Sequence, residues 1–397
     1  MTLIGTPNRL SNQAGQGENP LKGLLRFGQS VWLDYIRHDL ISKGELARLI
    51  EEDGLRGMTS NPTIFEKAIA HSEDYTPRLQ ELSQAKDLDA KGIYEQIAIR
   101  DIQDAAGALR RVYEETKRRD GYVSLEVSPH LAHKTQPTID EAMRLWKAVA
   151  RENIMIKVPG TAEGLPAIRE LLGRGVNVNI TLLFAQDVYQ QVAETYIAGL
   201  EGYVQKGGDP ARLASVASFF VSRIDTLVDN KINELLKNPP AGLDTNLACS
   251  LQGKVAIANA KLAYEIYKEV FSGPRWKTLA DRGAVTQRVL WASTGTKNPA
   301  YSDVLYVDEL IGPDTVNTMP PTTLDAFRDH GRPRASLEED IDTAKRTMAD
   351  LARLNISMKA VTDQLTEDGV KLFADAFEQL LVAVDRRAKH VASTALR

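Results

Sequence analysis

The sequence predicts an α/β fold, a single (β/α)8 TIM barrel, on three observations. Eight short apolar runs recur along the 397 residues, and a stretch with helical periodicity follows each of them. Parallel strands need such crossovers, and a sheet closed on itself leaves no unpaired edge. The competing fold is an open, doubly wound sheet, yet the sequence has no G-x-G-x-x-G after its first expected strand and no G-x-x-x-x-G-K-[ST].

The expected strands are apolar runs short enough to cross a barrel once. In chain order they are SVWLD (30–34), LRGMTS (55–60), YVSLEV (122–127), IMIKV (154–158), VNVNITLLF (176–184), ASVASFFVS (214–222), VLWAST (289–294) and the weaker DTVNTMP (314–320).

Helical signals lie between these runs. The segments 42–45 and 138–141 both fit the S/T-x-x-E capping box that opens a helix. In the segment 165–172 the apolar residues fall on one helical face, and Gly173 stops the helix before the next strand. These signals predict helices at the places where crossovers are needed.

Two regions exceed the basic barrel. The segment 224–276 is long for one crossover and is expected to hold two helices, split by the turn KNPPAGLD (237–244), so that the barrel has an insertion after its sixth strand. From Ser336 onward two more helices are expected to cover the barrel. Residues 1–20 are rich in Asn, Gln and Gly, and we expect them to form a flexible arm. We expect residues 21–397 to form one barrel domain that includes the covering helices.

Composition excludes several classes of function. The net charge is -4 and no basic block stands out, which argues against nucleic-acid binding. No long uncharged apolar run predicts a membrane span or a signal peptide. Cys249 is the single cysteine, and we expect it to be buried. A single cysteine cannot form an intramolecular disulfide, so we expect a cytoplasmic protein. His130 and His133 lack a third ligand nearby, and we expect no metal.

Polar residues gather where the expected strands end, which is where barrel enzymes carry their chemistry. Any one of them has a plain structural alternative: Asp34 could cap a helix, and Thr181 could bond to a neighbouring strand. As a set they predict a functional site. The set is Asp34, Thr59, Ser60, Asn61, Glu126, Lys157, Asn179, Thr181, Ser218 to Arg223, Ser293 and Thr294.

Lys157 follows three apolar residues and is the candidate nucleophile. A lysine attacks a carbonyl as the neutral amine, which removal from water favours, and the imine that forms is an electron sink for breaking the bond one carbon away. Glu126, on the adjoining strand, is the candidate acid and base for forming the carbinolamine and expelling water. Asp34 could take a proton from a substrate hydroxyl.

A separate anion site is expected at Arg223. The planar fork of Arg223 suits phosphate oxygens, and Ser293, Thr294 and Lys297 in ASTGTKN could add contacts. A nucleophilic lysine beside an anion site indicates a phosphorylated sugar as substrate.

Four motifs then resemble the transaldolase family, in the expected order over residues 31–321. WLDYIRHDLISKGELARLIEEDGLRGMTSNPTIF resembles its opening, IMIKVPGTAEGLPAI its Schiff-base lysine segment, VNVNITLLF the strand with its asparagine and threonine, and SFFVSRID its phosphate-binding stretch. The insertion and the helical C-terminus resemble a longer subgroup of that family.

The resemblance implies a role for each matching residue. Lys157 would be the nucleophile, Asp34 the proton acceptor in carbon–carbon cleavage, and Glu126 with Thr181 would hold a catalytic water. By the same resemblance Asn61, Asn179, Ser218 and Arg223 would contact substrate or phosphate. We also expect Thr59, Ser293 and Lys297 to bind substrate, although the ASTGTKN segment departs from some relatives, in which an arginine is expected near Lys297.

The implied reaction moves a dihydroxyacetone unit from sedoheptulose 7-phosphate to glyceraldehyde 3-phosphate in the non-oxidative pentose phosphate pathway, without metal or organic cofactor. Two alternatives stay open, a class I fructose 6-phosphate aldolase and a catalytically silent sugar-phosphate-binding barrel. The expected partners are phosphorylated sugars, not nucleic acid or membrane, and the chain is expected to be a monomer or a homodimer.

Overall fold

The computed structural model describes residues 19–85 and 87–395 and confirms the expected barrel. Its eight strands are all parallel and close in chain order, with the eighth paired to the first. Each expected run overlaps one of them, and no boundary that extends past a run does so by more than one residue. The strands are β1 (Gln29–Asp34), β2 (Gly57–Thr59), β3 (Tyr122–Glu126), β4 (Ile154–Pro159), β5 (Val178–Leu183), β6 (Ser215–Phe220), β7 (Arg288–Ala292) and β8 (Thr315–Met319). Most of the expected arm over residues 1–20 lies outside the described residues.

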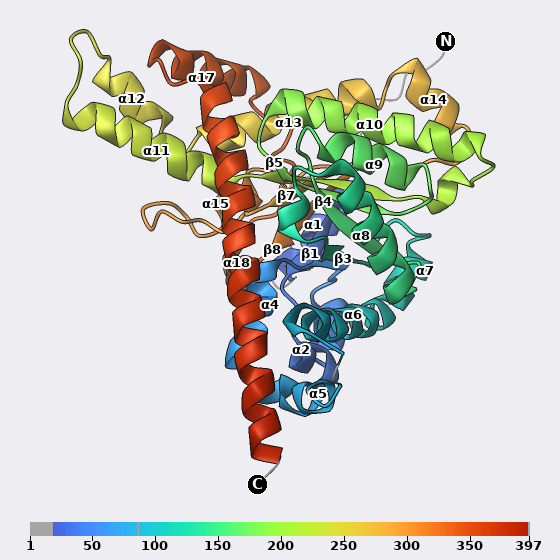
Figure 1. Cartoon of the computed structure of the whole chain (residues 1–397). Coiled ribbons are helices and arrows are strands. Elements are labelled where there is room, and N and C mark those ends of the chain that lie inside the picture. The colour runs from blue at the N-terminus through green and yellow to red at the C-terminus, as the bar shows by residue number, and fades with distance from the viewer. Residues whose placement is uncertain (1–18, 86, 396–397) are drawn as a thin grey trace.

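Helices surround this barrel (Figure 1). Up to β6 they are α1 (Pro20–Arg26), α2 (His38–Ser42), α3 (Glu45–Glu52), α4 (Pro62–His71), α5 (Thr76–Leu82), α6 (Ala90–Ala108), α7 (Arg110–Glu115), α8 (Thr135–Val149), α9 (Gly164–Leu172) and α10 (Gln186–Gln205). After β6 they are α11 (Ser222–Lys237), α12 (Thr245–Leu251), α13 (Val255–Val270), α14 (Pro274–Ala280), α15 (Leu305–Asp308), α16 (Pro321–His330), α17 (Ile341–Arg353) and α18 (Met358–Ala395). Short 3-10 turns are η1 (Glu73–Tyr75), η2 (Pro129–Leu131) and η3 (Pro210–Arg212).

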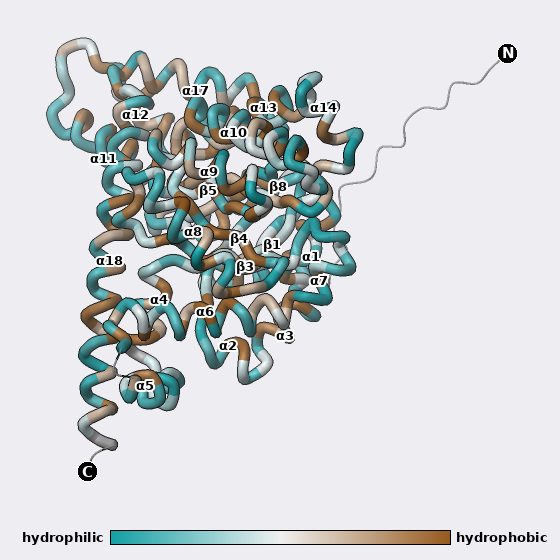
Figure 2. The backbone as a smooth tube through the Cα atoms, turned by 45° about the vertical axis from the view of Figure 1, so that its right-hand side comes forward, coloured by the Kyte–Doolittle hydropathy of each residue, from teal (hydrophilic) through white to brown (hydrophobic). Residues whose placement is uncertain are grey.

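The core lies between the strands and the inner faces of the helices. Nearly every strand residue is buried, as expected for a sheet covered on its outer face and filled on its inner face. Figure 2 shows apolar segments along the central strands and hydrophilic segments on the outer helices. Burial of the strands leaves their C-terminal ends as the place where polar side chains can meet a substrate.

Both expected capping boxes were wrong. Ser42 ends α2 instead of opening a helix, and α3 starts after Gly44, which has a φ of 83°. Thr138 lies one turn inside α8, where its hydroxyl donates to the carbonyl of Leu131. Glu141 accepts from the backbone N–H of Ser128 in the loop after β3. The S/T-x-x-E pattern is short, and here Thr138 and Glu141 make tertiary contacts, whereas Glu45 pairs with Arg48 within α3.

The insertion between β6 and β7 holds more helices than expected. The turn around 238–244 does separate α11 from the rest of the insertion, but α12, α13 and α14 replace the single second helix. Figure 1 shows α11 and α12 extending away from the barrel as a pair. Cys249, expected to be buried, is exposed on α12, because that helix buries its other face through Ala248 and Leu251.

The N-terminal end of the barrel is closed by a buried ion pair. Arg288, the first residue of β7, donates to Asp120 at 2.8 Å and to the Ser30 hydroxyl at 2.7 Å. Asp120 also accepts from Ser30 and from the indole N–H of Trp32. Two buried charges that are fully hydrogen-bonded avoid the cost of an unpaired buried ion. This end therefore serves stability and leaves the opposite end for function.

The expected covering helices are confirmed, and α18 reaches the functional end of the barrel. α18 contacts α4, α5, α6 and α11, and it also meets η2 and β5. In Figure 1 it runs along the whole height of the molecule on one side. At Gly369 a β-carbon would lie 2.9 Å from the Leu182 side chain at the end of β5. A late segment of the chain thus forms part of the wall around the strand ends.

Candidate active site

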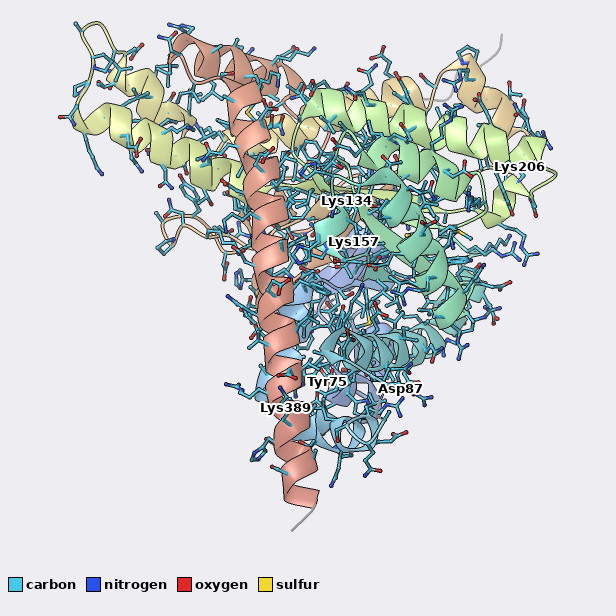
Figure 3. The ribbon with its side chains drawn as sticks, in the orientation of Figure 1. Tyr75, Asp87, Lys134, Lys157, Lys206 and Lys389 are labelled. Atoms are coloured by element: carbon cyan, nitrogen blue, oxygen red, sulfur yellow. The ribbon has the colours of Figure 1, made fainter. Side chains whose placement is uncertain are left out.

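Lys157 and Glu126 form a buried pair at the C-terminal ends of neighbouring strands. They face each other in the register between β3 and β4, and Glu126 Oε2 lies 3.2 Å from Lys157 Nζ. Lys157 is 5% exposed and Glu126 8%. The ammonium also donates to the carbonyl of Ser60 at 3.2 Å. Figure 3 shows Lys157 at the centre of the molecule, surrounded by other elements.

Asp34 is held at the end of β1 by the neighbouring strands. The Thr59 hydroxyl on β2 donates to Asp34 Oδ1 at 2.6 Å, and the Thr318 hydroxyl on β8 lies 2.7 Å from that of Thr59. Because the single hydroxyl proton of Thr59 goes to Asp34, Thr318 is the donor in the second contact. This chain of hydroxyls orients the Oδ1 atom of the Asp34 carboxylate.

Asn179 is fixed between two strands on the other side of Lys157. Its amide donates to the Ser124 hydroxyl at 3.0 Å, and its carbonyl accepts from the Ser218 hydroxyl at 2.7 Å. In the register of β4 with β5, Asn179 stands opposite Lys157. All these side chains are buried. The amide is therefore presented in one orientation beside the lysine.

Thr181 lies at an irregularity of β5. The register of β5 with β6 shifts between Ile180 and Leu183, and Leu182 has a φ of 61°. Bulges of this kind occur next to active sites, where they redirect a side chain. The Thr181 hydroxyl is buried and has no hydrogen-bond partner among residues 19–85 and 87–395, and the same holds for Glu126 Oε1. Buried polar atoms of this kind normally bind water or a ligand.

Arg223 lies in the first turn of α11, directly after β6. Its guanidinium carbon is 5.4 Å from the ring centre of Phe220 and 6.0 Å from that of Phe373 on α18. Ser293, with a φ of 56°, directly follows β7 and lies beside this helix start, since its hydroxyl is 3.0 Å from that of Ser222. A helix N-terminus with an arginine and hydroxyls is a favourable environment for an anion.

Two expected substrate residues are less central. The Asn61 side chain accepts from the backbone N–H of Ile64 at 3.1 Å and so caps α4, with Pro62 at the first helical position. Lys297 is exposed on the loop between β7 and α15. It reaches the site through its charge, because it helps to lower the pKa of Asp34.

Burial sets the electrostatics of Asp34. Desolvation raises the pKa of its carboxyl, and the charge of Lys157, the hydrogen bond from Thr59 and the charges of Arg223 and Lys297 oppose the rise. The net result is a carboxylate that takes up a proton more readily than an exposed aspartate does. A base with a raised pKa is better matched to proton transfer near neutral pH.

Glu126 is shifted in the same direction. Burial raises the pKa of its carboxyl, the charge of Lys157 lowers it, and the nearby charge of Asp34 raises it again. Burial lowers the pKa of Arg223, whereas the charge of Asp34 raises it. Two carboxyl groups with raised pKa and a lysine, gathered at one barrel end, are typical of a site for acid and base chemistry.

The family model for Transaldolase/Fructose-6-phosphate aldolase matches residues 31–384. The chain belongs to this family.

Relatives named transaldolase resemble this family member over nearly its whole length. The Transaldolase of Trichodesmium erythraeum (strain IMS101) is 46% identical over 373 residues, which cover 94% of this chain and 98% of that protein. The Transaldolase 2 of Nostoc sp. (strain PCC 7120 / SAG 25.82 / UTEX 2576) is 45% identical over 375 residues, which cover 94% of this chain and 98% of that protein. The Transaldolase of Thiobacillus denitrificans (strain ATCC 25259 / T1) is 46% identical over 366 residues, which cover 92% of this chain and 99% of that protein.

Three residues of the site in this family member are missing from the sequence prediction. Thr318 supports Thr59, Ser124 supports Asn179, and Phe373 lies over Lys157 with its ring centre 5.7 Å from Nζ. The sequence could have indicated Thr318, because this polar residue lies near the C-terminal end of the weak eighth strand, as the other candidates do on theirs. No local signal identifies Phe373, because its place depends on where α18 packs.

Other features are separate from this site. A cavity of about 500 Å³ opens between α13 and α17, lined by residues such as Lys261 and Thr347, and none of the candidate residues lines it. His130 and His133 pair with Glu378 and Glu163. Within the described part of the chain, no group of three or more His, Cys, Asp or Glu could hold a metal ion, and no helix is long and apolar enough to span a membrane.

Proposed function

We propose that this member of the Transaldolase/Fructose-6-phosphate aldolase family is a transaldolase that works through an imine at Lys157. It transfers a dihydroxyacetone unit from sedoheptulose 7-phosphate to glyceraldehyde 3-phosphate and yields erythrose 4-phosphate and fructose 6-phosphate. The observation that carries the proposal is the buried pair of Lys157 and Glu126 at the strand ends, 3.2 Å apart, with Asp34 near enough to act on both through its charge. The relatives named transaldolase support the activity.

The first stage forms the imine. Glu126 accepts a proton from the ammonium, and the freed electron pair on Lys157 Nζ attacks the carbonyl carbon of the ketose. The carbinolamine then loses its hydroxyl as water, with Glu126 returning a proton to the departing oxygen. The partnerless polar atoms of Thr181 and Glu126 support a water held between them that carries these protons.

The second stage breaks and remakes a carbon–carbon bond. Asp34 takes the proton from the hydroxyl on the far carbon of the bond to be broken, that carbon becomes the aldehyde of the departing aldose, and the bonding electrons neutralise the imine to give an enamine. The acceptor aldehyde then adds to the enamine carbon, its oxygen recovers the proton from Asp34, and water releases the new ketose from Lys157. Every proton is returned, so no other reactant is needed.

The phosphate end of the sugar would lie at Arg223. The N-terminus of α11 carries partial positive charge, and Arg223 and Ser293 add donors beside it. Lys297, on the loop between β7 and α15, would attract the phosphate through its positive charge. Asn179 and Ser218 would bind substrate hydroxyls near the imine, and Thr59 and Asn61 would line the β2 side.

The runner-up activity is a fructose 6-phosphate aldolase, since the family model covers both. The two activities share the imine and differ in the fate of the enamine, which a transaldolase keeps for an acceptor. Wild-type protein with fructose 6-phosphate alone should release little dihydroxyacetone, and adding erythrose 4-phosphate should start rapid formation of sedoheptulose 7-phosphate. Release of dihydroxyacetone as fast as fructose 6-phosphate is consumed, without an acceptor, would identify the aldolase.

The imine itself is tested by reduction. Borohydride added with fructose 6-phosphate should attach a three-carbon unit to the peptide that contains Lys157, as measured by mass spectrometry. Lys157→Met should abolish both the label and the transfer. A matched control is Lys261→Met, since Lys261 is equally buried but lies at α13 and donates to the carbonyl of Glu339. Label on another lysine of the wild-type protein would contradict the assignment.

Two further expectations accompany the proposal. We place the protein in the cytoplasm because its single cysteine cannot close an intramolecular disulfide and its substrates are sugar phosphates. We also propose that it is active as a monomer or homodimer, since the residues assigned to the reaction meet at the strand ends of a single barrel.

A further inference from the structure

Phe373 lies over the reactive lysine although it follows all eight strands in the chain. Its ring centre is 5.7 Å from Lys157 Nζ and 6.0 Å from the guanidinium carbon of Arg223, and the residue is 4% exposed. Both distances lie within the ~6 Å over which the face of an aromatic ring attracts a cation. One buried ring therefore contacts two positive groups of the site.

Contacts on both sides fix this part of α18. One turn before the ring, Gly369 approaches the end of β5 so closely that a β-carbon would lie 2.9 Å from Leu182 Cδ2. One turn after it, the ring of Phe377 is 5.9 Å from that of His130, and Glu378 Oε1 is 2.7 Å from His130 Nε2. The helix is thus attached to the loop after β3 and to the end of β5. These contacts on both sides fix the position of the Phe373 ring in the fold.

Charged groups from four other elements also act on this site. Glu126 on β3 pairs directly with Lys157, and Asp34 on β1 interacts with Lys157 through its charge. Arg223 on α11 and Lys297 on the loop after β7 add positive charge around Asp34. Phe373 is uncharged, so replacing it removes none of these charges, although it also removes the contact of the ring with Arg223. A difference between variants at this position therefore reports on the ring.

We propose that the face of Phe373 stabilises the positive charge of the protonated imine on Lys157. The inference rests on the proposed function, because it assumes that the imine forms there. The imine nitrogen is Nζ itself, so the cation forms at the atom that the ring already faces. The negative face of a ring attracts a cation most strongly where water is excluded, and this ring is almost wholly buried.

The ring takes no part in bond making. Loss of water from the neutral carbinolamine creates the cation, and addition of the enamine to the acceptor aldehyde creates it again. Stabilising the cation favours both steps and keeps the imine protonated to higher pH. In the cleavage step the cation is neutralised, so the ring should not speed that step. The effect is expected in the protonation of the imine, where it can be measured directly.

The test measures the pH at which the imine loses its proton. Protein is equilibrated with fructose 6-phosphate near neutral pH, freed of excess sugar, shifted rapidly to a series of alkaline pH values and quenched with cyanoborohydride, which reduces only protonated imine. The labelled Lys157 peptide is then quantified. In Phe373→Leu, which keeps an apolar side chain but no ring, the midpoint should fall by about one pH unit relative to wild type, the equivalent of one buried cation–π contact.

The matched control is Phe377→Leu. Phe377 lies one turn further along α18, is equally buried and contacts the rings of Tyr94 and His130. This variant should keep the wild-type midpoint. Equal midpoints in wild type, Phe373→Leu and Phe377→Leu would overturn the role of Phe373 while leaving the imine intact. A wild-type protein that gives no labelled Lys157 at any pH would overturn the proposed function, and this role with it.

A second series keeps the shape of the ring and guards against misfolding of the leucine variant. Replacing Phe373 with its mono-, di- and trifluorinated analogues progressively weakens the negative face and barely changes its size. The midpoint should fall stepwise with each added fluorine. A midpoint that stays constant across the series would show that the ring acts by packing alone, and the proposal would be wrong.

Discussion

Glu126 and Lys157 stand directly opposite each other on β3 and β4, and their side chains meet with 3.2 Å between Oε2 and Nζ. The side chains are 4% and 6% exposed, so water screens their interaction only weakly. A buried pair of this kind is costly to break, because removing one partner leaves an uncompensated group. Its position beside Asp34 and Asn179 is better explained by chemistry than by stability.

Glu126→Gln should slow transfer from fructose 6-phosphate to erythrose 4-phosphate by about 10²–10⁴-fold, the usual contribution of a positioned acid and base. The amide keeps the shape of the side chain but cannot exchange a proton with Lys157. The KM for the ketose should change little, since the substrate contacts assigned to Asn179 and Ser218 remain. Steady-state kinetics at saturating acceptor provide the measurement, and an unchanged kcat would remove Glu126 from the mechanism.

Thr59→Val should move the acid limb of the kcat profile to higher pH. Asp34 must be ionised to accept a proton, so activity falls as the pH drops through the pKa of Asp34. Burial raises that pKa, and the hydrogen bond from Thr59 lowers it. Losing a bond to a charged group should raise it further, by about one unit. Thr318→Val is the matched control, because it spares the bond between Thr59 and Asp34, and it should leave the limb nearly in place.

Arg223→Ala should raise the KM for phosphorylated ketoses far more than for their dephosphorylated forms. A bidentate contact between a guanidinium and a phosphate contributes more than a point charge does. Arg223→Lys should recover only part of the loss, since lysine restores the charge without the planar fork that lies over Phe220. Equal losses for both kinds of ketose would show that Arg223 serves the fold and not the phosphate.

Asp225→Asn should change how stability depends on pH. Burial raises the pKa of Asp225 to about 7, where it accepts from Ala256 N–H and from the Tyr306 hydroxyl. Between about pH 4 and pH 7, the native state therefore keeps a proton that the unfolded chain has lost. The contribution of Asp225 to the free energy of unfolding falls as the pH rises through this range. The loss reaches about 4 kcal/mol at most by pH 8.

The asparagine variant should lack this loss, so it should gain stability relative to wild type on going from pH 5 to pH 8. Urea unfolding at the two pH values gives the comparison. Asp363→Asn, at an exposed position on α18, should follow wild type at both. Parallel behaviour of Asp225→Asn and wild type would mean that Asp225 is already ionised in the native protein.

The sequence predicted the barrel and the gathering of polar residues at one end of it because both follow from local patterns. Each strand is an apolar run, and its last residues point a polar group such as Asp34 or Lys157 to the same end of the barrel. Parallel closure then brings residues together that are far apart in the chain, as with Ser218 and Asn179. Membership of the family is confirmed, whereas the roles of individual residues stay predictions for the experiments above.

The features that the sequence did not predict depend on tertiary packing. Ser42 and Thr138 match a helix-start pattern, but neighbouring elements decide where α3 and α8 begin. Cys249 lies in an apolar run, yet only one face of α12 packs against the protein, and the cysteine is on the other. The contact of Phe373 with Lys157 requires the path of α18 across the barrel, which no local pattern encodes.

The path of α18 has a consequence for biosynthesis. A chain leaves the ribosome from its N-terminus, so all eight strands are made before the helix that carries Phe373. We therefore expect a nascent barrel to close while Lys157 is still open to the surrounding solution. Docking of α18, which places Phe373 over this lysine, is then expected as a separate, late event.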